Sequence, residues 1–235
     1  MNAFIVYAHP ESKSFNGALL QRAKETLTAL GHDVRVSDLY GMKFDPVSDQ
    51  RNFTGRKEPA HFKQQLEELH AVESGGFAPE IAAEMEKLRW CDLLILQCPL
   101  WWFGLPGILK GWVDRVFAMG FAYGGGRWYS RGPFVGKRAM LSLTTGGPAL
   151  MYGPDGVNGD IDQILYPIQH GMLYFTGFSV LPPFIAWSVA RVEGAQRQSY
   201  LDAWAERLQR VSDTQPMPFP PLEAYDEKFR LKRVP

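Results

Sequence analysis

The chain has 235 residues, of which 46% are hydrophobic, and its 25 basic side chains balance 25 acidic ones. A chain of this length is expected to form one large domain that buries roughly 70 to 75% of its unfolded surface. Zero formal net charge gives no overall field that favours nucleic acid or an anionic membrane, and no apolar run approaches the ~20 residues of a membrane span, so we expect neither a nucleic-acid partner nor membrane insertion.

Strand-type runs alternate with helix-period runs along the chain, which is typical of βαβ units and a parallel sheet. The predicted strands are Phe4–Tyr7, Asp33–Val36, Leu93–Gln97, Arg138–Leu143 and Phe178–Leu181. This alternation predicts an α/β fold, in which right-handed crossovers follow from strand twist. We expect a flavodoxin-like, doubly wound, five-stranded parallel sheet with helices on both faces.

Three helical stripes support this fold. The first predicted helix carries Leu20, Ala23, Leu27 and Leu30 on one face and stops at Gly31. The second stripe, with a kink predicted at Pro167 and an end near Gly177, consists of Ile161, Leu165, Ile168, Met172 and Phe175. The last stripe consists of Leu201, Trp204, Leu208 and Val211.

Two segments do not fit a minimal fold of this class. Residues 40–76 form a long, mostly polar excursion that we expect to be functional or an interface. The domain is predicted to span residues 1–212, followed by a Pro-rich tail over 213–235. The tail ends in basic residues that we expect to be solvated on an extended arm: Lys228, Arg230, Lys232 and Arg233.

Cysteine usage favours a reducing compartment. Cys91 and Cys98 flank a predicted strand, which at ~3.3 Å per residue holds them about 23 Å apart, beyond disulfide reach. We therefore expect two reduced, buried thiols and a cytoplasmic location. With no Cys-x-x-Cys pair and five scattered histidines, we expect no metal site.

Polar or aromatic loops follow three of the predicted strands, where ligands bind in open α/β sheets. After the first strand, Ser14, Phe15 and Asn16 open a helix, whose unpaired N–H groups and dipole favour a phosphate. His9 in the same loop is a further candidate donor to a pyrophosphate. Ordinary capping by Ser14 or Asn16 explains this loop equally well when it is taken alone.

The other two loops suggest a flat ligand. Trp101, Trp102 and Phe103 follow the third predicted strand, and adjacent aromatics there favour stacking on a ring or a second subunit. The fourth strand leads into residues 144–147, whose hydroxyls and glycines allow close backbone approach, and then to a phenol and an amide. Fixed donors such as Tyr152 and Asn158 suit the electron-rich N1 and O2 of a reduced flavin.

These motifs together resemble the flavin-dependent NAD(P)H:quinone oxidoreductases of the DT-diaphorase type. The resemblance covers nearly the whole chain and rests on residues 8–10, 14–16, 37–40, 99–103, 109–112, 144–147 and Trp204. It implies a flavodoxin-like fold, bound FAD in preference to FMN, and a homodimer with two sites at the subunit interface. It also implies two-electron, ping-pong hydride transfer from NADH or NADPH to quinones or related aromatic acceptors.

The resemblance further implies roles for individual residues. The cofactor would be held by His9, Ser14, Phe15, Asn16, Pro99, Leu100, Trp101, Trp102, Phe103, Thr144, Thr145, Gly146, Gly147, Tyr152, Asn158 and Arg197. The substrate would stack beside Trp102, Phe103, Tyr123, Met151 and Phe175. Tyr152 and Asn158 would be the catalytic pair.

Some positions depart from the family pattern. One branch has a histidine where this chain has Asn158, and asparagine donates a hydrogen bond but cannot carry the proton. Another branch binds a metal through two histidines and a cysteine, of which only His170 is recognisable. Two other functions stay open: a flavodoxin-type electron carrier, and a regulatory flavoprotein subunit resembling those of bacterial potassium efflux systems.

Overall fold

The sheet has the strand order β2-β1-β3-β4-β5 with every pair parallel, and a short sixth strand pairs with β4. The computed structural model describes residues 1–232, so the predicted basic residue Arg233 lies outside the described part. The strands are β1 (Asn2–Tyr7), β2 (Asp33–Asp38), β3 (Leu93–Pro99), β4 (Arg138–Thr144), β5 (Ser179–Val180) and β6 (Phe184–Ala186). The flavodoxin-like prediction is confirmed.

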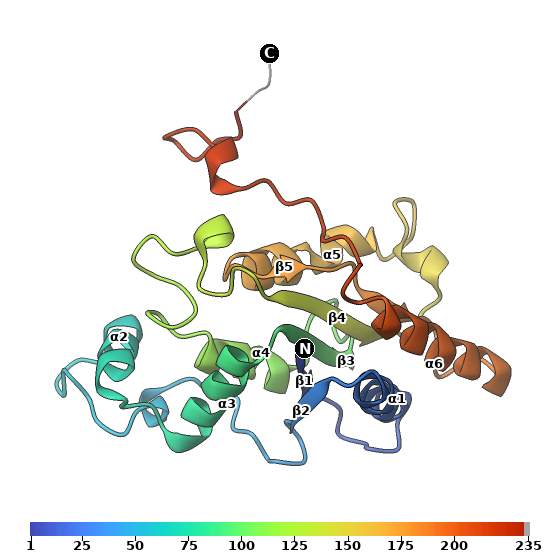
Figure 1. Cartoon of the computed structure of the whole chain (residues 1–235), viewed down its shortest axis with the longest axis horizontal. Coiled ribbons are helices and arrows are strands. Elements are labelled where there is room, and N and C mark those ends of the chain that lie inside the picture. Colours follow the sequence, from blue (N-terminus) through green and yellow to red (C-terminus); the bar gives the residue numbers. More distant parts are fainter. Residues whose placement is uncertain (233–235) are drawn as a thin grey trace.

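Helices cover both faces of the sheet, as Figure 1 shows. The α-helices are α1 (Phe15–Ala29), α2 (Gln64–Ser74), α3 (Pro79–Trp90), α4 (Gly107–Val116), α5 (Ile161–Ile168) and α6 (Gly194–Gln209). Helices α1 and α6 pack on one face, and α3, α4 and α5 contribute to the core on the other. All seven residues of β3 are buried because this central strand is covered on both sides.

Two helical predictions need correction. In α1 the buried face carries Leu19, whereas Leu30 is 42% exposed because the helix ends at Ala29 and Leu30 is its C-cap. The stripe from Ile161 does not stay α-helical to Gly177. Two residues after Pro167, α5 gives way to a π-helix, Gln169–Tyr174, in keeping with the backbone N–H that proline removes.

A buried polar cluster joins α3, α4 and β2. The Glu84 carboxylate accepts hydrogen bonds from the Ser37 hydroxyl at 2.7 Å and from the Trp112 indole N–H at 2.8 Å. Its second oxygen lies 2.6 Å from Lys87 Nζ, which also donates to the Ser37 hydroxyl. Every polar side-chain atom of this cluster therefore has a partner.

The excursion over residues 40–76 is anchored to the body by α4. The buried Arg115 donates to Asn52 Oδ1 at 2.7 Å and pairs with Glu80 on α3 at 3.0 Å. The excursion contains a short 3-10 helix, Gln50–Asn52, and α2. It thus has secondary structure of its own, held in place through a buried guanidinium.

The tail first lies along the body and then leaves it (Figure 1). Met217 N donates to Val180 O at 2.7 Å, and Met217 and Phe219 pack against the core. Farther along, Glu223 forms an ion pair with Arg131 at 2.7 Å. The tail is therefore attached to the body through several contacts rather than left wholly to solvent.

Cys91 and Cys98 are both free and buried, as predicted. Burial raises the pKa of the Cys91 thiol to about 11 and raises that of Cys98 as well. Among residues 1–232, no helix has the length and apolar character needed to cross a bilayer. No group of three or more potential metal-binding His, Cys, Asp or Glu side chains occurs in that range either.

Candidate flavin site

The loop from β1 to α1 leaves the first turn of the helix open to an anion. Ser14 is the N-cap, and its hydroxyl accepts the Gly17 N–H at 3.2 Å. No acidic residue occupies the first turn, so the positive end of the helix dipole is not neutralised there. A Cβ on Gly17 would lie 1.9 Å from the Ser12 carbonyl oxygen, so only glycine allows the loop to fold against the helix.

A cavity of about 420 Å³ opens at this helix N-terminus. Its lining consists of His9, Lys13, Ser14, Phe15, Asn16, Ala18, Thr144, Val189, Ala190 and Arg197. Six of the predicted cofactor residues are thus brought together from the β1–α1 loop, α1, β4 and α6. The lining also contains three basic or potentially cationic side chains and no carboxylate, which suits a phosphate.

Two side chains in this lining are almost completely buried. Asn16 is 2% and Thr144 is 4% exposed, and Asn16 Nδ2 donates to Thr144 Oγ1 at 2.7 Å. Because Thr144 accepts this bond, its own O–H is available to donate to a ligand. Asn16 Oδ1 has no protein partner, so an acceptor also remains at the cavity. These donors and acceptors fit a flavin with its phosphates.

The aromatic loop after β3 forms a strained two-residue turn. Trp101 and Gly104 exchange backbone hydrogen bonds of 3.1 and 2.9 Å, while Trp102 and Phe103 have φ values of 50° and 59°. Such turns normally use Asn or Gly, and a non-glycine residue in this region costs on the order of 1–3 kcal/mol. The turn leaves Trp102 97% exposed, so its ring is presented to something outside this chain's core.

The loop after β4 brings the predicted catalytic pair onto one compact segment. Asn158 N donates to Met151 O at 2.9 Å, and Tyr152 is buried with its ring 5.3 Å from that of Trp187. A Cβ on Gly147 would lie 3.2 Å from the Tyr152 ring, so the loop packs tightly around the phenol. Thr145 Oγ1 donates to Gly147 O at 2.8 Å, which fixes the start of the loop.

The predicted substrate residues do not all meet within one chain. Tyr123 and Phe175 lie with ring centroids 5.7 Å apart in a second cavity, of about 570 Å³. Gln65 Nε2 donates to the Tyr123 hydroxyl at 3.1 Å, and burial raises the pKa of that hydroxyl. Trp102, Phe103 and Met151 do not line this cavity. The aromatic set is therefore divided between two places.

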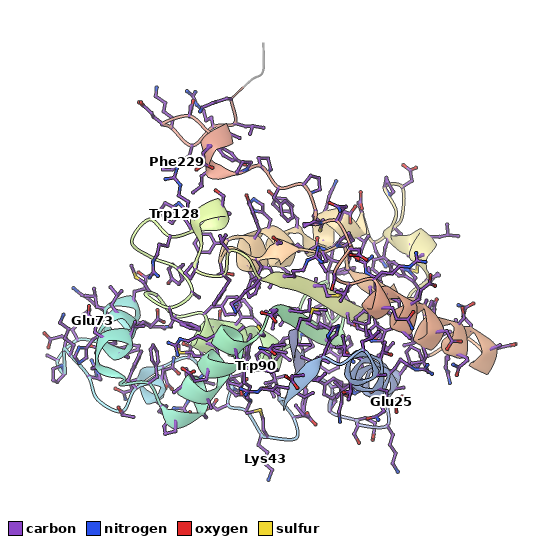
Figure 2. The ribbon with its side chains drawn as sticks, viewed as in Figure 1. Glu25, Lys43, Glu73, Trp90, Trp128 and Phe229 are labelled. Carbon is purple, nitrogen blue, oxygen red and sulfur yellow. The ribbon has the colours of Figure 1, made fainter. Side chains whose placement is uncertain are left out.

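A third cavity, of about 400 Å³, involves residues that the sequence analysis missed. It lies between the segment before β4 and the tail, and Figure 2 shows Trp128 and Phe229 on its two sides. Its lining consists of Trp128, Tyr129, His170, Phe175, Pro220, Leu222, Tyr225 and Phe229. Tyr225 and Phe229, near the charged end of the tail, could have indicated this cavity from the sequence, because an extended and solvated arm does not need aromatic side chains.

Comparison with known proteins agrees with the fold. A family model described as the flavodoxin-like fold matches residues 1–209. NAD(P)H dehydrogenase (quinone) 1 from Cavia porcellus is 43% identical over 229 residues, which cover 97% of this chain and 83% of the relative. The chain belongs to this quinone oxidoreductase family.

Other members of the family are similarly close. The human ribosyldihydronicotinamide dehydrogenase (quinone) is 44% identical over 215 residues, or 91% of this chain and 93% of that protein. A solved structure from Klebsiella pneumoniae, described as a candidate quinone reductase, has a TM-score of 0.96 at 43% identity. That superposition covers 99% of this chain and 94% of the other.

Proposed function

We propose that this chain is a flavin-dependent NAD(P)H dehydrogenase that reduces quinones by two electrons, with FAD as its cofactor. The observation that carries the proposal is the cavity at the N-terminus of α1, where six residues chosen from sequence lie together. Relatives named as NAD(P)H dehydrogenases acting on quinones support the same activity.

The cavity residues would bind the phosphates and the ribityl chain. The open N–H groups of the first turn of α1, with His9 and Lys13, supply donors and positive charge. Arg197 Nε donates to Val189 O at 3.0 Å, which holds its guanidinium at the far wall. A cavity that continues from α1 to a second cation on α6 supports a dinucleotide, with FMN as the alternative.

A bound flavin would supply hydride exchange, and the protein would supply position and electrostatics. Tyr152 and Asn158 are the proposed donors that stabilise negative charge on the reduced ring. Asparagine can donate a hydrogen bond but cannot carry a proton. We therefore propose that dipoles and the Tyr152 phenol, rather than an imidazolium, stabilise the reduced flavin.

The divided aromatic set supports a homodimer with sites between the two chains. Trp102, almost fully exposed on its turn, needs a surface opposite it, and Tyr123 with Phe175 forms an aromatic wall elsewhere on the same chain. In a dimer, Tyr123 and Phe175 of one chain would lie opposite the Trp102 turn of the other. NAD(P)H and the quinone would occupy that space in turn, which is the ping-pong order. The two free, buried thiols support a cytoplasmic location.

Anaerobic stopped-flow spectroscopy tests the proposal. The flavin-loaded protein is mixed with NADH, NADPH or a dihydronicotinamide riboside, absorbance near 450 nm is followed, and menadione is then added. We expect rapid bleaching without an intermediate radical and full reoxidation by menadione. Slow reduction by every donor would contradict the proposal, and a stable radical on titration would favour an electron carrier.

The role of Asn158 has its own test. We expect the rate of flavin reduction to lack a steep fall across pH 6.5, the ordinary pKa of histidine. Asn158→His should introduce such a dependence. A fall near that pH in the wild-type protein, if it persists after replacement of His9, would show that an unassigned imidazole acts instead.

A further inference from the structure

The sheet face under α1 changes from apolar to polar toward the carboxyl ends of its strands. Tyr7 on β1 is paired in register with Gln97 on β3, which is paired with Ser142 on β4. All three side chains are at most 1% exposed. The apolar residues that precede them on the same strand faces are Ala3, Ile5, Leu93, Ile95 and Met140. Three neighbouring strands thus place a row of buried polar side chains directly before the cavity.

One member of this row reaches the first turn of α1. Gln97 Nε2 donates to the backbone carbonyl of Asn16 at 2.6 Å, a contact between residues 81 positions apart in the sequence. Asn16 in turn donates through Nδ2 to Thr144, and both residues line the cavity. Gln97 is therefore one contact removed from the proposed phosphate site and does not line it.

The row also leaves hydrogen-bonding capacity unused. Within residues 1–232, four of the eight buried side-chain polar atoms without a protein partner are Tyr7 Oη, Asn16 Oδ1, Gln97 Oε1 and Ser142 Oγ. Unpaired buried polar atoms lower stability, and an apolar side chain would avoid the cost. Their concentration beneath one cavity indicates that the amide of Gln97 serves the site rather than the core.

We propose that Gln97 is a positioning residue for the flavin phosphate site. Its amide N–H holds the Asn16 carbonyl, and so fixes the first turn of α1 where its backbone N–H groups and the Asn16–Thr144 pair face the cavity. This inference rests on the proposed flavin function. It predicts that Gln97 matters for ligands that carry a phosphate and not for the flavin ring alone.

The test compares three ligands and needs no turnover. Binding of FAD, FMN and riboflavin to the apoprotein is measured by titration calorimetry. For Gln97→Met, which keeps the length and loses the amide, we expect FAD and FMN to bind at least about tenfold more weakly. Riboflavin, which has no phosphate, should bind as it does to the wild-type protein. Gln169→Met is the matched control, because Gln169 is also buried and lies outside this cavity.

A second variant, Gln97→Glu, makes flavin binding depend on pH, and it tests the proposal even if Gln97→Met does not fold. In Gln97→Glu the neutral acid can donate to the Asn16 carbonyl, whereas the ionised carboxylate cannot and also repels phosphate. The ratio of FMN to riboflavin affinity should therefore rise as the pH falls, while the wild-type ratio changes less.

The outcomes separate this inference from the proposed function. Equal weakening of all three ligands, or no weakening, in Gln97→Met would overturn the positioning role of Gln97. A flat pH profile in Gln97→Glu would do the same. A wild-type protein that binds none of the three flavins would instead overturn the proposed function itself, and this inference with it.

Discussion

Both faces of the sheet bury polar side chains, but they differ in how completely those side chains are hydrogen-bonded. On the side of α3 and α4, each polar atom of the Glu84 cluster has a partner. On the side of α1, the row of Tyr7, Gln97 and Ser142 has unpaired atoms on all three side chains. Folding alone accounts for a saturated cluster, whereas an unsaturated one needs another reason.

Position in the molecule agrees with that distinction. The Glu84 cluster contributes no residue to the three cavities described above. The α1 side instead passes directly into the proposed flavin cavity through Asn16 and Thr144. On one face the Glu84 cluster is saturated and remote from the cavities, whereas on the other face the unsaturated row adjoins the proposed flavin cavity. Four substitutions test this difference between the two faces.

Glu84→Ala should have the largest effect. It would leave the Trp112 indole N–H, the Ser37 hydroxyl and the Lys87 ammonium without their shared acceptor. We expect the free energy of unfolding to fall by about 3–5 kcal/mol in a urea titration followed by circular dichroism. The exposed Glu86 on the same helix provides a control, since Glu86→Ala should change the free energy of unfolding by no more than about 0.5 kcal/mol. Weaker flavin binding by the folded Glu84→Ala protein would show that the Glu84 cluster also affects the flavin site, and would contradict the difference between the two faces.

Thr144→Val should act mainly on binding. It removes the hydroxyl that accepts from Asn16 and is free to donate into the cavity. We expect the flavin dissociation constant to rise on the order of tenfold, which corresponds to about 1.4 kcal/mol. Thr28→Val, on the exposed surface of α1, should leave binding unchanged in the same fluorescence titration. Equal affinities for the two variants would mean that Thr144 is not in contact with the flavin.

Glu68→Gln addresses a buried carboxylate whose hydrogen-bond partners are neutral. Burial raises the pKa of Glu68, which accepts from Met119 N at 2.7 Å and from the Gln64 amide at 2.9 Å. Because the pKa of Glu68 is higher in the folded than in the unfolded protein, stability is lost as the pH rises from the ordinary pKa of a glutamate through the raised pKa. Glu68→Gln should therefore gain stability relative to the wild-type protein across that range, by less than the Glu84→Ala loss. Melting temperatures of the two proteins from pH 4 to 8 measure this, and parallel curves would contradict it.

Ser142→Ala should have the smallest effect on stability. Its Oγ has no protein partner in the buried row, so no hydrogen bond is lost. We expect the free energy of unfolding to stay within about 0.5 kcal/mol of the wild-type value in the same urea titration. A loss as large as that of Glu84→Ala would show that both faces of the sheet are equally structural.

Much of the fold was predictable because hydrophobic periodicity is a local property. The alternation of apolar runs located every main strand, and the stripe of Trp204, Leu208 and Val211 is buried as expected. The errors came where local geometry competes with the pattern. Leu30 continues the apolar stripe but follows the last helical residue, and Pro167 precedes a π-helix that a regular period cannot show.

The pattern of residues along the chain was enough to predict the fold class. It also showed that His9, Ser14 and Asn16 follow one predicted strand and that Thr144 follows another, so all four were expected at one edge of a parallel sheet. Only the folded chain shows the long-range contacts. It paired Asn16 with Thr144 across 128 positions and Glu84 with Ser37 across 47. It also separated Tyr123 and Phe175 from the Trp102 turn. The physical reason is that strand register and helix packing set these contacts, and neither is encoded in the residues immediately around each side chain.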